Sequence, residues 1–107
     1  MEGNIDKIVL TEAVYYILLS IYTPMHGYGI MQNVSELSNG RVNLGPGTLY
    51  GAINTLLEKK WIVPLTEDLN SRKKEYLITD LGKEIVKNEI VRLEELVKNG
   101  KKMRGEN

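Results

Sequence analysis

Gly45-Pro46-Gly47-Thr48-Leu49-Tyr50-Gly51-Ala52-Ile53-Asn54-Thr55-Leu56-Leu57-Glu58 is the stretch of the chain that decides its fold. Proline is tolerated in the first turn of a helix, where its missing amide has no partner to lose, and glycine can cap that end. Apolar residues recur every three or four positions, so a helix over 46–58 would gather them on one face. They are Leu49, Ala52, Ile53, Leu56 and Leu57. The opposite face would carry Gly47, Gly51, Asn54, Thr55 and Glu58, with Thr48 and Tyr50 on its flanks.

Two further helices are predicted before this stretch. Apolar residues recur with helical spacing between Ile8 and Tyr22, and the pattern ends at Thr23-Pro24, because proline cannot donate a helical hydrogen bond. A second pattern covers residues 28–37 and ends at Asn39-Gly40, where glycine can adopt the conformation that terminates helices. Its inward positions are predicted to be Ile30, Met31, Val34 and Leu37.

A β-hairpin and a last helix are predicted after it. Residues 61–66 and 75–79 are rich in β-branched and aromatic side chains, and seven of the eight residues between them are polar. Pro64 should lie on an outer strand, because it cannot donate to a central ladder. Thr79 or Asp80 can cap a helix that ends near Lys98, and the tail from Gly100 to Asn107 is expected to fray.

The order of these elements predicts a mainly α protein with a β-hairpin, namely a winged helix-turn-helix followed by one C-terminal dimerisation helix. A DNA-binding domain is expected at 8–79, the dimerisation helix at 80–99 and a frayed tail at 100–107. Trp61 is expected to be buried in the core, and Tyr28 and Tyr76 are expected to pack between the helices and the hairpin. His26 is interpreted as a turn or packing residue.

Composition excludes much enzyme chemistry. The 107 residues include no cysteine and a single histidine, so thiolate metal sites, disulfides, cysteine nucleophiles and histidine clusters are excluded. Glu94 and Glu95 are adjacent and would point apart on a helix, so they form no acid/base pair. We therefore expect no enzyme and no cofactor or metal. The chain also lacks a secretory signal and any apolar run near the ~18 residues that cross a bilayer, which favours a cytoplasmic protein without membrane contact.

Charge is zero in sum but uneven along the chain. Residues 1–40 hold one lysine against four carboxylates, whereas residues 41–74 hold six cations against three carboxylates. In a winged helix-turn-helix the third helix enters the DNA major groove, and the hairpin lies along the backbone. Small residues at 47 and 51 would allow a close approach, Asn54 suits an adenine edge, and Thr48 or Tyr50 suits a phosphate or a thymine methyl group. The predicted DNA-binding residues are Gly47, Thr48, Tyr50, Gly51, Asn54, Arg72, Lys73 and Lys74.

Two plainer interpretations stay open. The two glycines could serve only close helix–helix packing, and a basic turn is usually just a solvated turn. The rival function is a winged-helix protein–protein interaction module that binds no DNA, because fold alone does not settle function.

Three stretches resemble the PadR-type transcriptional regulators. They are His26-Gly27-Tyr28-Gly29-Ile30, then Pro46-Gly47-Thr48-Leu49-Tyr50 followed by Leu56-Leu57-Glu58 and Trp61-Ile62, then the run from Arg72 to Gly82. Together they cover most of residues 8–98 in the order of that family, and the single C-terminal helix looks like the smaller subfamily. The resemblance implies a homodimer that represses its own or a neighbouring gene from an inverted-repeat operator in double-stranded DNA. It also implies that Thr48 and Tyr50 contact DNA and that Arg72 and Lys73 lie on the wing.

The predicted last helix carries an apolar seam that little of its own domain would cover. In the family that it resembles, this helix packs against the first helix of the other subunit, which predicts an interface of Val9, Tyr16, Val86, Ile90, Leu93 and Val97. Some small members bind flat aromatic compounds between the subunits on tryptophans of this helix, but this chain has no aromatic residue after Thr79. A small aromatic effector in a pocket of Glu12, Tyr15, Leu19 and Leu93 stays a hypothesis.

Overall fold

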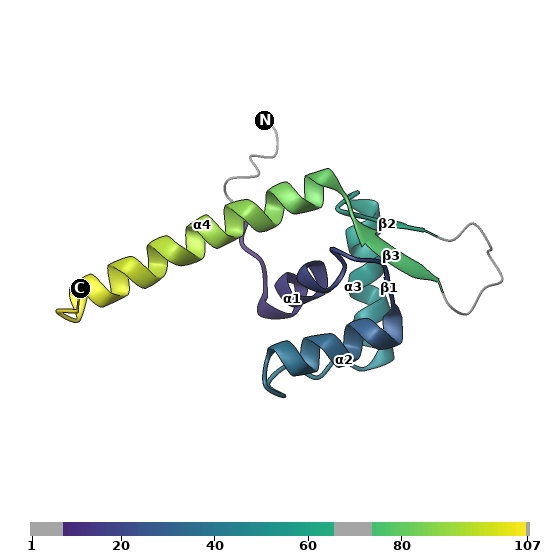
Figure 1. Ribbon diagram of the computed structural model, residues 1–107, viewed down its shortest axis with the longest axis horizontal. Helices are drawn as coiled ribbons and strands as arrows, with labels where there is room; N and C mark the ends of the chain where they lie inside the picture. Colours follow the sequence, from purple (N-terminus) through teal and green to yellow (C-terminus); the bar gives the residue numbers. More distant parts are fainter. Residues whose placement is uncertain (1–7, 66–73, 107) are drawn as a thin grey trace.

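The computed structural model describes residues 8–65 and 74–106, and within them four helices and three strands (Figure 1). In chain order the elements are α1 (Glu12–Ser20), β1 (Met25–His26), α2 (Gly27–Leu37), α3 (Pro46–Glu58), β2 (Ile62–Pro64), β3 (Glu75–Ile78) and α4 (Asp80–Met103). This is the predicted winged helix-turn-helix architecture, with one long helix at its end.

Three of the helices begin at residues whose side chains cap them. The Thr11 hydroxyl accepts a hydrogen bond from the Val14 amide at 3.1 Å, and the Thr79 hydroxyl accepts one from the Gly82 amide at 3.0 Å. His26 Nδ1 accepts from the Gly29 amide at 3.2 Å, which confirms the interpretation of His26 as a local turn residue. Helix α3 has no such cap and begins instead with Pro46 in its first turn.

The small sheet has the order β1-β3-β2, and both pairs are antiparallel. Pro64 lies on β2, an outer strand, as predicted. The sequence did not predict β1. This strand has two residues, Met25 paired with Tyr76 and His26 paired with Glu75, and so short a pairing leaves no alternating pattern to detect.

The core lies where α1, α2 and α3 meet the sheet and the start of α4. Trp61 and Tyr76 are buried in it, as predicted. Tyr28 is 62% exposed, so its predicted packing between helices and hairpin is wrong, because the side chain points outward and its hydroxyl accepts from the Gln32 amide at 3.3 Å. Leu37, predicted inward, is also exposed at the last turn of α2. The buried apolar residues are Ile17, Leu18, Ile21, Ile30, Val34, Leu49, Ile53, Leu56, Trp61, Ile62, Tyr76, Ile78, Ile85 and Val86.

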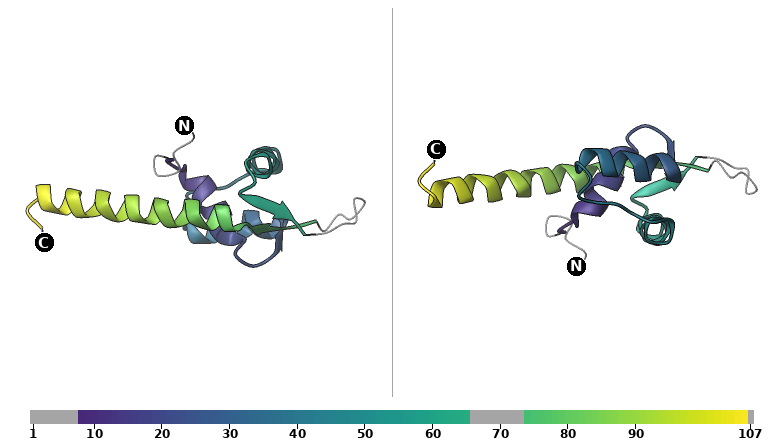
Figure 2. Two further views of the ribbon diagram at one scale, coloured as in Figure 1. Left: turned by 90° about the horizontal axis from the view of Figure 1, so that it is seen from above. Right: turned by 90° about the horizontal axis from the view of Figure 1, so that it is seen from below.

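Helix α4 starts against the sheet, passes α1 and then extends away from the other elements (Figures 1 and 2). It continues past Lys98, where the sequence predicted its end, and Gly100–Met103 are helical instead of belonging to a frayed tail. One interior glycine costs a helix only about 1 kcal/mol, and Lys101 and Lys102 favour the negative end of the helix dipole. Within the described residues, no helix combines the length and the apolarity that a membrane span requires.

Candidate nucleic-acid interface

The outward face of α3 is exposed to solvent, and its side chains are small. Gly47, Thr48, Gly51 and Asn54 all face solvent, and the apolar side chains of the helix face the core as predicted. The threonine at 55 satisfies its own hydroxyl, which donates to the Gly51 carbonyl at 3.2 Å. The face therefore offers the groups of Thr48 and Asn54 around two positions without side chains.

The two glycines of α3 pack against nothing in the described parts of the chain. Apart from its chain neighbours and the backbone of its own helix, an ideal Cβ added at Gly47 or at Gly51 would have no heavy atom within 4 Å. The interpretation that these glycines serve close helix–helix packing within the subunit is therefore wrong. A glycine inside a helix lowers helix stability by about 1 kcal/mol relative to alanine. Gly47 and Gly51 therefore do not stabilise the described part of the subunit.

Tyr50 is placed by the start of α2. A Cβ added at Gly27 would lie 2.2 Å from the Tyr50 hydroxyl oxygen and 2.7 Å from the ring carbon that bears it. With the ring in this position, a side chain at 27 would collide with its hydroxyl end, and the ring stays 43% exposed. Burial raises the pKa of Tyr76, and the nearby Tyr50 adds to the shift. Tyr50 of α3 lies against the start of α2, a contact that sequence reasoning missed.

The hairpin contributes one described basic residue. Lys74 is half-buried and directly precedes β3, whereas Arg72 and Lys73 lie outside the described residues. Lys59 and Lys60 follow the last turn of α3 and are exposed. The described parts of the surface therefore place positive charge at the end of α3 and at the start of β3.

A second exposed surface runs along α1 and α4 and contains most of the residues predicted for the subunit interface. Val9 is 65% and Val97 is 55% exposed, Ile90 is exposed, and Tyr16 and Leu93 are half-buried. Val86 is buried in the core of its own subunit, so it is not part of this surface, because α4 passes directly over the sheet and α1 at that point.

Two hollows between α1 and α4 share Tyr15 and Leu93 as lining residues. One has a volume of about 270 Å³ and is lined by Tyr15, Ile90, Leu93, Glu94 and Val97. The other, of about 380 Å³, is lined by Leu10, Thr11, Glu12, Tyr15, Tyr16, Glu89, Arg92 and Leu93. Of the four residues predicted for an effector pocket, Glu12, Tyr15 and Leu93 line the second hollow and Leu19 does not.

Ion pairs organise the polar side of this region. Glu89 is buried and accepts two hydrogen bonds from Arg92, at 2.8 Å and 2.6 Å. These bonds lower the pKa of the Glu89 carboxyl below its usual range, and a backbone hydrogen bond from Leu10 adds to the shift. The carboxylate of Glu12 pairs with Arg41, whose hydrogen bond lowers the pKa of Glu12. The three-residue spacing of Glu89 and Arg92 was visible in the sequence, but nothing there indicated that the pair would be buried.

Comparison with known proteins identifies the family. The model of the transcriptional regulator PadR-like family matches residues 16–88, more than half of the chain. The chain belongs to this PadR-like family. Its members are transcriptional regulators, and the resemblance noted in the sequence is thereby confirmed.

Solved structures share the PadR-like fold at low sequence identity. A transcriptional regulator from Clostridium thermocellum superposes with a TM-score of 0.68 at 23% identity, covering 84% of this chain and 89% of that one. A PadR family transcriptional regulator from Eggerthella lenta gives 0.65 at 19% identity, covering 84% and 75%. A 37.1 kDa protein from transposon TN4556 of Streptomyces fradiae, itself uncharacterised, is 38% identical over 66 residues. That match covers 62% of this chain and 18% of the relative, so the chain spans only a small part of its length.

Proposed function

We propose that this PadR-like regulator binds a specific inverted repeat in double-stranded DNA as a homodimer and represses transcription there. The observation that carries the proposal is the open face of α3, where Gly47 and Gly51 pack on nothing in the described subunit. A helix face without bulk can enter the major groove deeply, because the groove is only wide enough for one helix. Thr48 and Asn54 supply the polar groups beside it, and positive charge stands at Lys60 and Lys74.

Two variants test the role of α3. Gly51→Leu should raise the free energy of unfolding by about 0.5–1 kcal/mol, because leucine favours helices and meets open space. The same variant should weaken binding to a duplex selected from random sequence by about tenfold or more, since the side chain would hold the helix away from the base edges. Thr48→Ala should also weaken binding without loss of stability.

The matched control is Asn99→Leu, which adds the same side chain to an exposed site of α4. Binding is measured by fluorescence anisotropy and unfolding by urea. The assigned contacts are overturned if Gly51→Leu and Thr48→Ala bind like the wild type. Absence of any selected sequence would favour the protein–protein interaction module instead.

The homodimer is proposed from the exposed surface of α1 and α4. The distal half of α4 has little of its own subunit beneath it, and Leu96 and Val97 are both more than half exposed. A second copy would bury this stripe, and the two-fold axis would place two α3 helices in successive major grooves, about 34 Å apart. Within the described residues, α4 offers no other apolar stripe of this length.

Val97→Asp tests the dimer, with Val91→Asp as its matched control. The two valines are equally exposed, at 55% and 58%, but Val91 lies on the polar side of α4. Light scattering should find monomers for Val97→Asp and dimers for Val91→Asp. Equal behaviour of the two variants would contradict the proposed interface.

A small aromatic effector is proposed for the two hollows beside Tyr15, because they lie on the same surface of α1 and α4 and would be covered by the second subunit. The described part of α4 carries no aromatic side chain, so Tyr15 would provide the stacking surface. Tyr15→Ala should then abolish any release of DNA by planar aromatic compounds. Undiminished release would exclude this pocket.

A further inference from the structure

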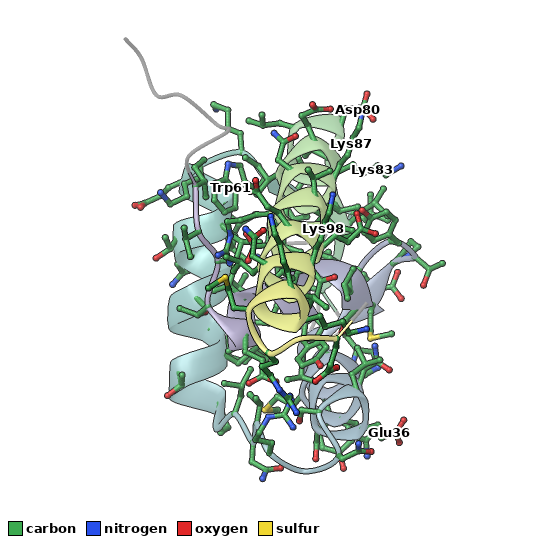
Figure 3. All side chains as sticks on the ribbon, turned by 90° about the vertical axis from the view of Figure 1, so that its left-hand side faces the viewer. Glu36, Trp61, Asp80, Lys83, Lys87 and Lys98 are labelled. Atoms are coloured by element: carbon green, nitrogen blue, oxygen red, sulfur yellow. The ribbon has the colours of Figure 1, made fainter. Side chains whose placement is uncertain are left out.

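A third hollow lies between α3 and the segment that leads into α1, and it shares Leu10 and Thr11 with the second hollow. Its volume is about 330 Å³, and Trp61 is one of its lining residues. In Figure 3 Trp61 lies on the side of α4 where α3 runs. The described residues that line it are Ile8, Val9, Leu10, Thr11, Val14, Ala52, Thr55, Leu56, Lys59 and Trp61.

The walls of this hollow are mainly aliphatic, and Trp61 is the one aromatic side chain among the described lining residues. The two threonine hydroxyls are already engaged locally, Thr11 with the Val14 amide and Thr55 with the Gly51 carbonyl. An occupant would therefore be held mostly by contact with aliphatic side chains, which favours a flexible hydrocarbon over a ligand rich in hydrogen-bonding groups.

Lys59 gives the hollow its only charge among the described lining residues. Its ammonium nitrogen lies over the Trp61 ring, 5.3 Å from the ring centroid. A carboxylate beside it would form a charge-assisted hydrogen bond, whereas an ammonium group would be repelled. The hollow thus combines an aliphatic wall with a single cation.

We propose that this hollow binds a medium-chain aliphatic monocarboxylate. The carboxylate pairs with Lys59, and the hydrocarbon lies along Leu10, Val14 and Leu56. The volume falls at the lower end of the usual range for small-molecule sites, about 300–1,000 Å³, which suits a chain of this length. The site goes beyond the proposed DNA binding. No α4 residue is among its described lining residues, but it shares Leu10 and Thr11 with the second hollow and Val9 with the predicted subunit interface.

Octanoate is the probe, with octan-1-ol and octylamine as neutral and cationic controls of equal length. Trp61 is the only tryptophan of the chain and lines the hollow, so its fluorescence reports occupancy directly. Octanoate should change the emission saturably and bind about tenfold more tightly than octan-1-ol, as expected for one charge-assisted hydrogen bond. Octylamine should bind most weakly of the three.

Lys59→Met should reduce the affinity for octanoate to that for octan-1-ol. Lys83→Met is the matched control, because its ammonium also lies over an aromatic ring, 5.8 Å from that of Tyr22. Figure 3 shows Lys83 on the opposite side of α4 from Trp61, so octanoate binding should be unchanged. Ala52→Leu fills the hollow and should abolish saturable binding, with circular dichroism confirming that the variant is folded.

Equal affinities for the three probes, no saturable binding, or full octanoate affinity in Lys59→Met would each overturn the proposal. The titration contains no DNA. Its failure would therefore leave the proposed operator binding untouched, and a failure of operator binding would leave this site standing.

Discussion

Gly82 and Gly100 lie in the same helix but in opposite surroundings, and replacing each by alanine tests how α4 is docked. A Cβ at Gly82 would lie 2.3 Å from the Trp61 carbonyl oxygen and 2.6 Å from Cγ1 of Ile78. At Gly100 it would meet no atom within 4 Å among the described residues. The same substitution should therefore change stability in opposite directions.

The expected magnitudes follow from these contacts. Alanine gains about 1 kcal/mol over glycine inside a helix, and at Gly100 nothing opposes that gain. At Gly82 the Trp61 carbonyl cannot move freely, because it accepts a hydrogen bond from the Thr79 amide at 2.9 Å. Overpacking costs about 1–3 kcal/mol, and more against fixed backbone. Gly82→Ala should therefore lower the free energy of unfolding by about 1–2 kcal/mol net. Gly100→Ala should gain about 0.5–1 kcal/mol.

Urea unfolding at one fixed protein concentration measures both changes, with far-ultraviolet circular dichroism as the signal. The wild type should unfold at a urea concentration between those of the two variants. If Gly82→Ala unfolds at or above the wild-type midpoint, the close contact between α4 and Trp61, the residue before β2, is refuted.

Two further predictions concern charge. Glu89→Gln should destabilise the protein at neutral pH by on the order of 1 kcal/mol, because Arg92 loses its charged partner. The folded-state pKa of Glu89 is below the ordinary 4.5, so this contribution to stability is present above that value and is lost as the pH falls through the lowered pKa. The free energies of unfolding of wild type and variant should therefore converge in acid. A difference that stays constant with pH would count against the ion pair. If Lys74 contacts a phosphate, Lys74→Gln should weaken binding to all duplexes and lower the slope of log affinity against log salt concentration by about one unit. Lys83→Gln should bind like the wild type, and an unaltered slope in Lys74→Gln would reject the phosphate contact.

The helical part of the fold could be predicted because its signals are local. The spacing of Leu49, Ile53 and Leu56 fixed the buried face of α3, and all three are buried in the structure. Thr79 was recognisable as a cap, and it does cap α4. These features depend only on residues within one or two turns of each other.

The features that failed prediction depend on tertiary contacts. Whether Val86 faces a partner or its own core is decided by where α4 passes over α1, and the heptad-like spacing is the same in both cases. Tyr28 belongs to a stretch that resembles the family, but its side chain points outward. Tyr50 lies against Gly27, although the two residues are 23 positions apart in the chain. The two-residue strand β1 exists only because β3 is beside it.

The central claim, specific recognition of an inverted repeat by two copies of α3, is tested most directly by selecting bound duplexes from a random library with the full chain. The account predicts enrichment of one inverted repeat whose half-sites are about one helical turn apart, or a multiple of it, bound by two chains. Retention of duplexes without any enriched sequence, or of none at low salt, would contradict it.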